Sequence, residues 1–404
     1  MRVAIVAVAA ASAHGQSVLS LREAVSQALA GNPVLEAASS RVSAQKALRT
    51  QALLRPNPRL ILQQENLRPY QSPNYVYLRE TDSFAYLQNT LETAGKREAR
   101  AGSAEAGIAK SEAERELLRR QIVTRVVAAY WAAAGAAHVV DLLAENERNF
   151  ARIVDYHAVR VREGSMAEAD LLRVTIEAQR LRIERNRAAL EAERARIHLQ
   201  REMARTEFPA LRFSEELRSD LPDYEPVDVA AVMARRPEVR LARSVVESAR
   251  AQERVQVAAA RPNVDLLFGY KRTGGVDTML GGVQVDLPVR NRNQGNVAAA
   301  SAETRAAESA LAATQALIRA EVESAVAEYR QRRSDVASVL RPLVDQAVEG
   351  YRIAEAAYRE GGADLLRLLD AQRVQIEARI SYARALAELR LSEAALQAAL
   401  GVEP

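Results

Sequence analysis

The stretch REGSMAEADLLR, residues 162–173, has a close counterpart in REGGADLLR, residues 359–367. Both start with a basic and an acidic residue, continue with glycine, and end on the run Ala-Asp-Leu-Leu-Arg. Glycine makes a tight chain reversal inexpensive, and an aspartate just before leucines is typical of a helix start. The repeated stretch therefore predicts two helical hairpins, each reversing at a glycine.

The distribution of proline predicts that these hairpins are very long. Prolines cluster before residue 74 and between residues 209 and 288, whereas the tracts after the two clusters contain only Pro342 and the terminal Pro404. Such tracts are free to be helical, and at 1.5 Å per residue the arm before each turn would extend roughly 100 Å. We expect hairpins over residues 95–203 and 292–400, with a kink at Pro342.

The duplication extends well beyond the turns. Four pairs of similar segments follow in the same order: ALAGNPVLEAA (28–38) with VMARRPEVRLA (232–242), ALLRPNPRLIL (52–62) with AAARPNVDLLF (258–268), the two ADLLR runs, and AQRLRIE (178–184) with AQRVQIE (371–377). Chance does not give four matches in one order, so the chain consists of two copies of one unit. We expect the first copy over residues 20–203, a connector over 204–225, and the second copy over 226–401.

Each copy also contains two segments with the alternation of a β-strand. In the second copy Leu266 and Phe268 fall on one face and Leu267 on the other. We expect strands at about 59–67, 83–91, 264–271 and 279–287. Four strands do not close a barrel, and an open sheet edge cannot face lipid, so a membrane-spanning sheet would need other copies of the chain. Three copies would give an even number of strands, namely 12.

Composition argues against several other functions. The net charge is +4, but arginine alternates with glutamate along the long runs, which is typical of a solvated helix surface and not of nucleic-acid binding. The chain has no cysteine and only four scattered histidines. We therefore expect no catalytic residues, no cofactor and no metal site.

The N-terminal segment resembles a secretory signal. Residues 1–15 contain one arginine, a short apolar run and small residues before a possible cleavage after Ala13 or Gly15, although a disordered apolar tail is the alternative. We find no other stretch near 18 apolar residues and expect no transmembrane helix. Export to a soluble location or into a β-barrel remains open at this point.

These residues resemble the TolC-like outer-membrane efflux protein family. The similarity covers nearly the whole chain and is carried by LREAVSQALAGNP (21–33), LETAGKREAR (91–100), YHAVRVREGSMAEADLL (156–172), RRPEVRLA (235–242), RPNVDLLFGY (261–270), VQVDLPVRNRNQGNV (283–297) and YREGGADLLRLLDAQR (358–373). LETAGKREAR is similar to the form in the cobalt-zinc-cadmium branch, which would imply a heavy-metal exporter.

The resemblance implies a mixed, mainly α fold. Long hairpins would form a periplasmic α-barrel, and four strands per chain would contribute to a trimeric 12-stranded transmembrane β-barrel in outer-membrane lipid. The implied partners are two further copies, a periplasmic adaptor (membrane-fusion) protein and an inner-membrane pump of the resistance-nodulation-division type. The alternative from the residues alone is a periplasmic adaptor or a coiled-coil scaffold without a pore.

The resemblance also gives the repeated turns a function at the periplasmic end. There the turns would meet the adaptor, with two unequal docking tips per chain. Glycines would make the turns, aspartates would cap the returning helices, and leucines would contact the adaptor or pack between hairpins: Gly164, Asp170 and Leu171 in the first tip, and Gly361, Asp364 and Leu365 in the second. Candidates for bracing or lining the closed aperture are Tyr351, Glu355, Tyr358, Arg359 and Glu360.

Overall fold

The computed structural model describes residues 17–68, 74–224 and 227–403, and the proposed signal peptide over residues 1–15 lies outside these ranges. The chain divides into two compact units. The first takes the residues up to Leu35, Leu118–Arg235 and the residues from Ile318 onward; the second takes Glu36–Leu117 and Arg236–Leu317. Each unit therefore combines corresponding parts of both sequence repeats.

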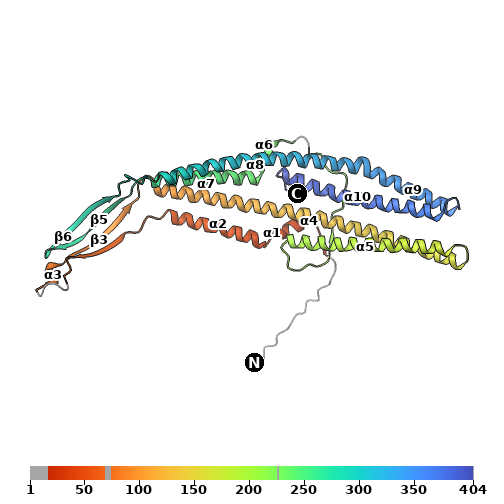
Figure 1. The fold of residues 1–404 in the computed structure, drawn as a ribbon, viewed down its shortest axis with the longest axis horizontal. Coiled ribbons are helices and arrows are strands. Elements are labelled where there is room, and N and C mark those ends of the chain that lie inside the picture. Colours follow the sequence, from red (N-terminus) through yellow and green to blue (C-terminus); the bar gives the residue numbers. More distant parts are fainter. Residues whose placement is uncertain (1–16, 69–73, 225–226, 404) are drawn as a thin grey trace, which may run out of the picture. The chain divides into compact units, whose positions relative to one another are not determined.

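The second unit contains one antiparallel sheet with the strand order β2-β3-β5-β6 (Figure 1). The strands are β2 (Arg59–Glu65), β3 (Asp82–Leu91), β5 (Val264–Thr273) and β6 (Val276–Val285). The two copies of the repeat meet where β3 pairs with β5, from Leu91↔Val264 to Ser83↔Arg272. The expectation of two antiparallel strands from each repeat is confirmed.

The turn between β5 and β6 explains the close pairing of these two strands. Gly274 and Gly275 lie between the partners Thr273 and Val276, with φ angles of +58° and +80°. Two successive positive φ values are the geometry of the hairpin turn whose twist matches that of the strands, and glycine adopts it at no steric cost. The short helix α3 (Tyr77–Glu80) lies in the longer connection between β2 and β3.

The two faces of the sheet differ in chemistry. Cross-strand partners on one face are apolar: Leu60, Leu87 and Phe268 in one row, and Leu62, Ala85, Tyr270 and Met279 in the next. All of them except the half-buried Ala85 are solvent-exposed. The rows of the other face are mixed. The row between these two carries Ile61, Tyr86, Gly269 and Leu280, and the rows on either side carry Gln63, Phe84, Lys271 and Thr278, and Arg59, Gln88, Leu267 and Gly282. The alternation predicted for Leu266, Leu267 and Phe268 is thus present. In the single chain, the apolar face of the sheet is exposed to solvent.

The helices α2 (Pro33–Ala52) and α7 (Pro237–Ala259) occupy corresponding places in the two repeats. Each begins with the proline of the matched sequence pair, a residue whose restricted φ suits the first turn of a helix. In the second unit the Arg250 guanidinium of α7 forms an ion pair with Glu308 of α8 (Gln294–Ser334) at 2.7 Å. The residues recognised as a repeat therefore adopt the same local structure twice.

The chain forms two long hairpins, and the first unit contains them except for the parts of their outgoing helices up to Leu117 and up to Leu317 (Figure 1). The first is formed by α4 (Lys96–Arg162) and α5 (Glu168–Glu202), and the second by α8 (Gln294–Ser334), η1 (Asp335–Leu340), α9 (Arg341–Arg359) and α10 (Leu365–Ala399). One apolar cluster joins them, with contributions from α4, α5 and α10: Val139, Leu143, Phe150, Val174, Leu181, Ala188, Leu365, Leu368, Leu369, Ile376 and Ala383. The two repeats are therefore packed against each other by their hairpins.

The second hairpin is interrupted at the position predicted from Pro342. The π-helix η1 directly precedes α9, where Pro342 occupies the second position. Proline lacks an N–H group and its ring crowds the carbonyl four residues earlier, here that of Ser338 within η1. A π-helical turn accommodates this loss because it changes the hydrogen-bond register of the helix.

A second apolar cluster anchors the N-terminal elements to α4. The short parallel strands β1 (Ser17–Leu19) and β4 (Leu211–Phe213) and the helix α1 (Leu21–Leu29) pack there; α6 (Val229–Arg235) follows the connector. The buried Tyr130 hydroxyl lies within hydrogen-bonding distance of Glu215, whose other carboxylate oxygen accepts from the Leu21 N–H at 2.8 Å. Burial alone would raise the pKa of Glu215, but these hydrogen bonds and one from Ser214 outweigh it and lower that pKa.

This cluster also accounts for an unexpectedly apolar part of α4. By length and composition α4 is apolar enough to cross a membrane, with an 18-residue window of mean hydropathy 1.5, half of it buried. The expectation that no further apolar stretch of this length exists is therefore wrong. Ile122, Val126, Tyr130 and Ala133 of α4 lie in the apolar cluster, so the hydropathy reflects packing inside the first unit.

Candidate functional site: the paired hairpin turns

The two hairpin turns have the same backbone geometry. Gly164 and Gly361 lie two residues after α4 and α9, with φ angles of +70° and +78°. Ser165 N–H donates to Arg160 C=O at 2.9 Å, and Gly362 N–H donates to Ala357 C=O at 2.8 Å. The glycine N–H groups donate to Val161 and Tyr358 in the same pattern. Both helices therefore end in a Schellman motif, which needs a left-handed residue at this position.

The starts of the returning helices differ. Asp364 is the N-cap of α10, and its Oδ1 accepts from the Arg367 N–H at 2.9 Å. The N-cap of α5 is Ala167, which offers no side-chain hydrogen bond, and Asp170 lies inside the first turn. The extra residues of the first tip let α5 begin before the aspartate. The prediction of a cap is thus confirmed for Asp364 and wrong for Asp170. The Asp170 carboxylate in the first turn still interacts favourably with the positive end of the helix dipole.

The leucines of the tips fall on different faces. Leu365 is 6% exposed and belongs to the apolar cluster between the hairpins, so it is not available to a partner. Leu171 is half-buried. The exposed side chains are instead Leu172 at 60% and Leu366 at 61%, which occupy matching positions in the two ADLLR runs. Of the two roles expected for the first leucine of each run, Leu365 therefore has the packing role, and the sequence analysis did not single out the exposed Leu172 and Leu366.

The sequence did contain a signal for these two residues. The buried face of α10 follows Leu365, Leu368, Leu369, Gln372 and Ile376, a spacing of three and four residues. Leu366 lies outside this stripe. Applying the helical spacing to the first turn of α10 would therefore have predicted that Leu366 is exposed.

The helix α5 has a second apolar stripe that nothing in the chain covers among the residues described. Val174, Leu181 and Ala188 are buried at intervals of seven residues. Ile176, Ile183, Leu190 and Ile197 repeat at the same interval but are 51%, 51%, 52% and 38% exposed. A seven-residue repeat of apolar side chains is the pattern of a seam between packed helices. The exposed stripe is therefore suited to a further helix.

The aperture candidates form two groups. Tyr351 and Tyr358 pack against the apolar cluster, and burial is the main reason that the pKa of each is raised. Glu355 and Arg359 form an ion pair of 2.8 Å along α9, and Glu360 is the exposed C-cap. The two tyrosines thus join the hairpins, whereas the charged residues lie on the surface of α9.

His157 was not recognised as a site residue. It is 1% exposed on α4, and its Nε2 lies 3.1 Å from the Tyr358 hydroxyl on α9. The rings of these two residues are nearly parallel, with centroids 6.1 Å apart. The sequence showed only that the histidines are scattered, because the partner lies in the other repeat.

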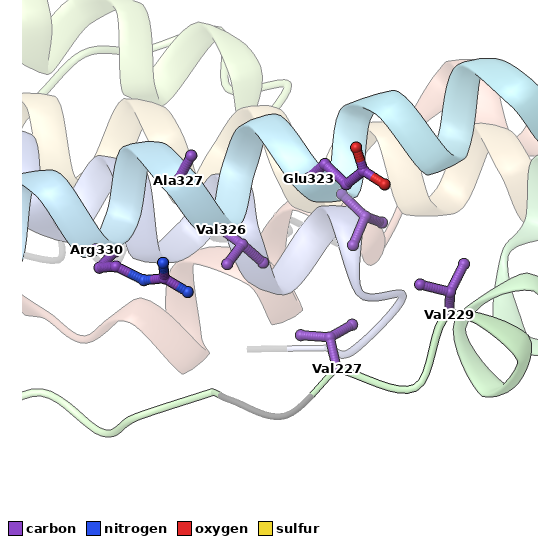
Figure 2. A pocket seen from close by; sticks show the side chains of 7 residues that line it. Val227, Val229, Glu323, Val326, Ala327 and Arg330 are labelled. Atoms are coloured by element: carbon purple, nitrogen blue, oxygen red, sulfur yellow. The ribbon is translucent and has the colours of Figure 1, made fainter.

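The lining of one cleft in the first unit does not suggest a reaction. A cleft of about 620 Å³ between the start of α6 and α8 is lined by Val227, Val229, Val322, Val326 and Ala327, with Glu323 and Arg330 at its sides (Figure 2). This lining contains no nucleophile paired with a base. Across residues 17–68, 74–224 and 227–403, no group of three or more metal-ligating side chains is placed to hold an ion.

The fold is similar to those of several solved outer-membrane channels. The fold matches that of the outer-membrane channel OprN with a TM-score of 0.77 at 23% identity, over 94% of this chain and 89% of that one. It also matches CusC with a TM-score of 0.78 at 17% identity, over 95% and 92%.

The sequence comparisons agree with the fold. Residues 229–402 match the family described as outer membrane efflux protein. The cobalt-zinc-cadmium resistance protein CzcC of Cupriavidus metallidurans is 23% identical over 394 residues, which cover 95% of this chain and 90% of that protein. Over residues 229–402 the chain is similar to the outer membrane efflux protein family, and over 95% of its length it is similar to CzcC. These similarities and the fold favour an outer-membrane channel over an adaptor or scaffold without a pore.

Proposed function

We propose that this chain is the passive exit duct of a tripartite efflux system, assembled as a homotrimer in the outer membrane. The observation that carries the proposal is the four-stranded sheet, whose apolar face is exposed and whose outer strands β2 and β6 have no further strand beside them among the described residues. Exposed apolar rows suit lipid, and unpaired edges in lipid require closure by further strands. Three chains would supply 12 strands.

The exposed stripe on α5 supports assembly in the helical part. In a trimer Ile176, Ile183 and Leu190 would pack against a helix of the neighbouring chain, while Val174 and Leu181 pack within the chain. The hairpins of three chains would then enclose a helical barrel. The repeat boundaries 20–203 and 226–401, the connector 204–225 and the cleaved segment 1–15 belong to the same proposal.

The tips supply the contact with the adaptor. Leu172 and Leu366 expose apolar side chains at equivalent places directly after the two turns. A helical hairpin of a periplasmic adaptor would pack on them, and the adaptor would link the duct to an inner-membrane pump of the resistance-nodulation-division type. Because each chain has two unequal tips, a trimer would offer six docking positions of two kinds.

The cargo that we propose is heavy-metal cations. The support is the similarity to CzcC, a protein named for resistance to cobalt, zinc and cadmium. The described residues hold no resident metal cluster, so selection would occur in the pump and adaptor and not in this chain.

Assembly is tested by native mass measurement of the detergent-solubilised outer-membrane fraction. We expect a complex of three chains. Substituting Ile183→Glu and Leu190→Glu should reduce the trimer fraction, whereas the exposed pair Glu184→Gln and Glu191→Gln on the same helix should leave it unchanged. Recovery of a stable monomer from wild-type membranes would overturn the proposal.

Docking and cargo are tested together in a strain that depends on this chain for efflux. Leu172→Arg with Leu366→Arg should leave the trimer in the outer membrane but abolish crosslinking to the adaptor and tolerance of cobalt, zinc and cadmium, because a charge would enter an apolar helix contact. Arg173→Ala with Arg367→Ala serves as the neighbouring control. Normal crosslinking in the leucine double variant would contradict the docking site, and unchanged metal tolerance on deletion of the gene would contradict the cargo.

A further inference from the structure

Among the described residues, the side-chain hydrogen bond between His157 and Tyr358 joins α4 of the first hairpin to α9 of the second. It lies close to both tips, seven residues before Gly164 and three residues before Gly361. The contact is enclosed, since His157 is 1% exposed and Tyr358 packs against the apolar cluster between the hairpins. A change at this pair would therefore act on the joint between the hairpins.

The hydrogen bonds determine which form of the imidazole fits. Nδ1 lies 2.8 Å from the carbonyl oxygen of Ile153, which only accepts, so Nδ1 must carry a proton. In the neutral ring Nε2 is then an acceptor, and the Tyr358 hydroxyl donates to it at 3.1 Å. Neutral His157 thus has both ring nitrogens matched.

Protonation would remove this match. Nε2 would become a donor, and the Tyr358 hydroxyl would have to accept and turn its own proton toward the apolar cluster. A charged imidazole in an enclosed site also loses the hydration that stabilises it. Among the described residues no carboxylate lies within ion-pair distance of His157.

The charged and titratable groups around the pair do not replace that hydration. On α4 Tyr156 stands edge-on to the His157 ring, and the Arg160 guanidinium lies 5.8 Å from the centre of the Tyr156 ring, where its charge opposes a second positive charge. On α5 Asp170 is close enough to act on the Tyr358 hydroxyl and favours the protonated histidine. On α9 Glu355 is paired with Arg359, and the residues that α10 contributes to the cluster are apolar.

We propose that His157 and Tyr358 form a proton-sensitive latch, which holds the two hairpins together near their tips when His157 is neutral and releases them when it is protonated. The Nε2 atom of the imidazole is the acceptor in this contact and the atom that would take up a proton, so the latch would respond to acidification of the periplasm. Only the consequence of the latch, an easier opening of the duct at its tip end, rests on the proposed function.

The latch is tested by the distance between the two tips. The chain has no cysteine, so Glu163→Cys and Glu360→Cys, the equivalent exposed C-cap positions of α4 and α9, provide two spin-label sites in an otherwise unchanged protein. Labelled chains diluted with unlabelled ones report the distance within one chain by pulsed electron paramagnetic resonance. We expect lowering the pH from 8 to 5 to move most of the distance distribution to longer values.

Two variants separate the latch from other titrations. In His157→Gln the amide can donate to Ile153 and accept from Tyr358 without titrating, so the distribution of pH 8 should persist at pH 5. Tyr358→Phe keeps the ring but removes the hydroxyl, so the long distances should appear already at pH 8. The inference is overturned if the wild type shows no shift, if His157→Gln keeps the shift, or if Tyr358→Phe behaves as the wild type. Because no outcome depends on export, failure of the latch differs from failure of the efflux function.

Discussion

The two hairpins have nearly the same turn but different helices on either side of it. The first has an uninterrupted outgoing helix of 67 residues and a returning helix without a side-chain cap. The second has an outgoing helix broken by η1 before Pro342 and a returning helix capped by Asp364. Duplication therefore retained the backbone geometry that glycine permits, whereas the side chains that cap or interrupt the helices of each hairpin diverged.

The largest expected effect comes from the first leucine of each ADLLR run. Leu365→Arg should destabilise the protein by about 3–5 kcal/mol, since it removes a buried leucine and places an unpaired charge in the apolar cluster. Leu171→Arg should cost clearly less, because Leu171 is half-buried and its charge can reach water. Urea unfolding of the solubilised protein measures both. Equal costs would show that the two tips are packed alike.

The sheet provides a second comparison, in which the repeats should agree. Leu62 and Phe268 occupy matching positions in the two copies and are 72% and 63% exposed on the same face. In a lipid bilayer Leu62→Arg and Phe268→Arg should each cost about 2–4 kcal/mol if they lie near the midplane. Leu267→Arg, on the other face, should cost less. Unfolding of the reconstituted protein tests the three variants, and a mild Phe268→Arg combined with a severe Leu267→Arg would reverse the assignment of faces.

Most of the fold was predictable because it depends on patterns that are local or repeated. The long proline-free tracts indicated the helices, the alternation around Phe268 indicated a strand, and the glycines at 164 and 361 indicated the reversals. Pro342 indicated a disturbance of its helix, although the sequence predicted a kink and the structure resolves the disturbance as a π-helix.

The parts that sequence reasoning missed depend on contacts between distant segments. Leu365 and Leu366 are chemically identical neighbours, and only the packing of α10 against the first hairpin makes one buried and the other exposed. His157 and Tyr358 come from different repeats, so neither residue has a local signal for the other. Ala167 shows a third cause, because the length of the first tip moved the helix start away from the expected aspartate.

A smaller effect is expected from the two turn glycines, where the hairpins should respond equally. A Cβ at Gly164 or at Gly361 would meet no atom within 4 Å, so the cost of alanine comes from the positive φ alone. Gly164→Ala and Gly361→Ala should each destabilise the protein by about 1–2 kcal/mol. Thermal unfolding of the two single variants provides the measurement. A much larger loss in one of them would mean that its turn also packs against something outside the chain.

The smallest effect separates the two helix starts. Asp364→Ala removes the hydrogen bond to the Arg367 N–H and should cost about 1 kcal/mol, whereas Asp364→Asn, which keeps an acceptor, should cost little. Asp170→Ala loses only the interaction of a charge with the helix dipole, so we expect a loss of about 0.3–0.5 kcal/mol. The reciprocal change Ala167→Asp places a capping side chain on an extended N-cap residue and should stabilise the first hairpin by up to about 1 kcal/mol. Unfolding curves of the four variants under one set of conditions give the order. If Asp170→Ala costs as much as Asp364→Ala, or if Ala167→Asp gains nothing, the difference between the two helix starts lies elsewhere than in the cap.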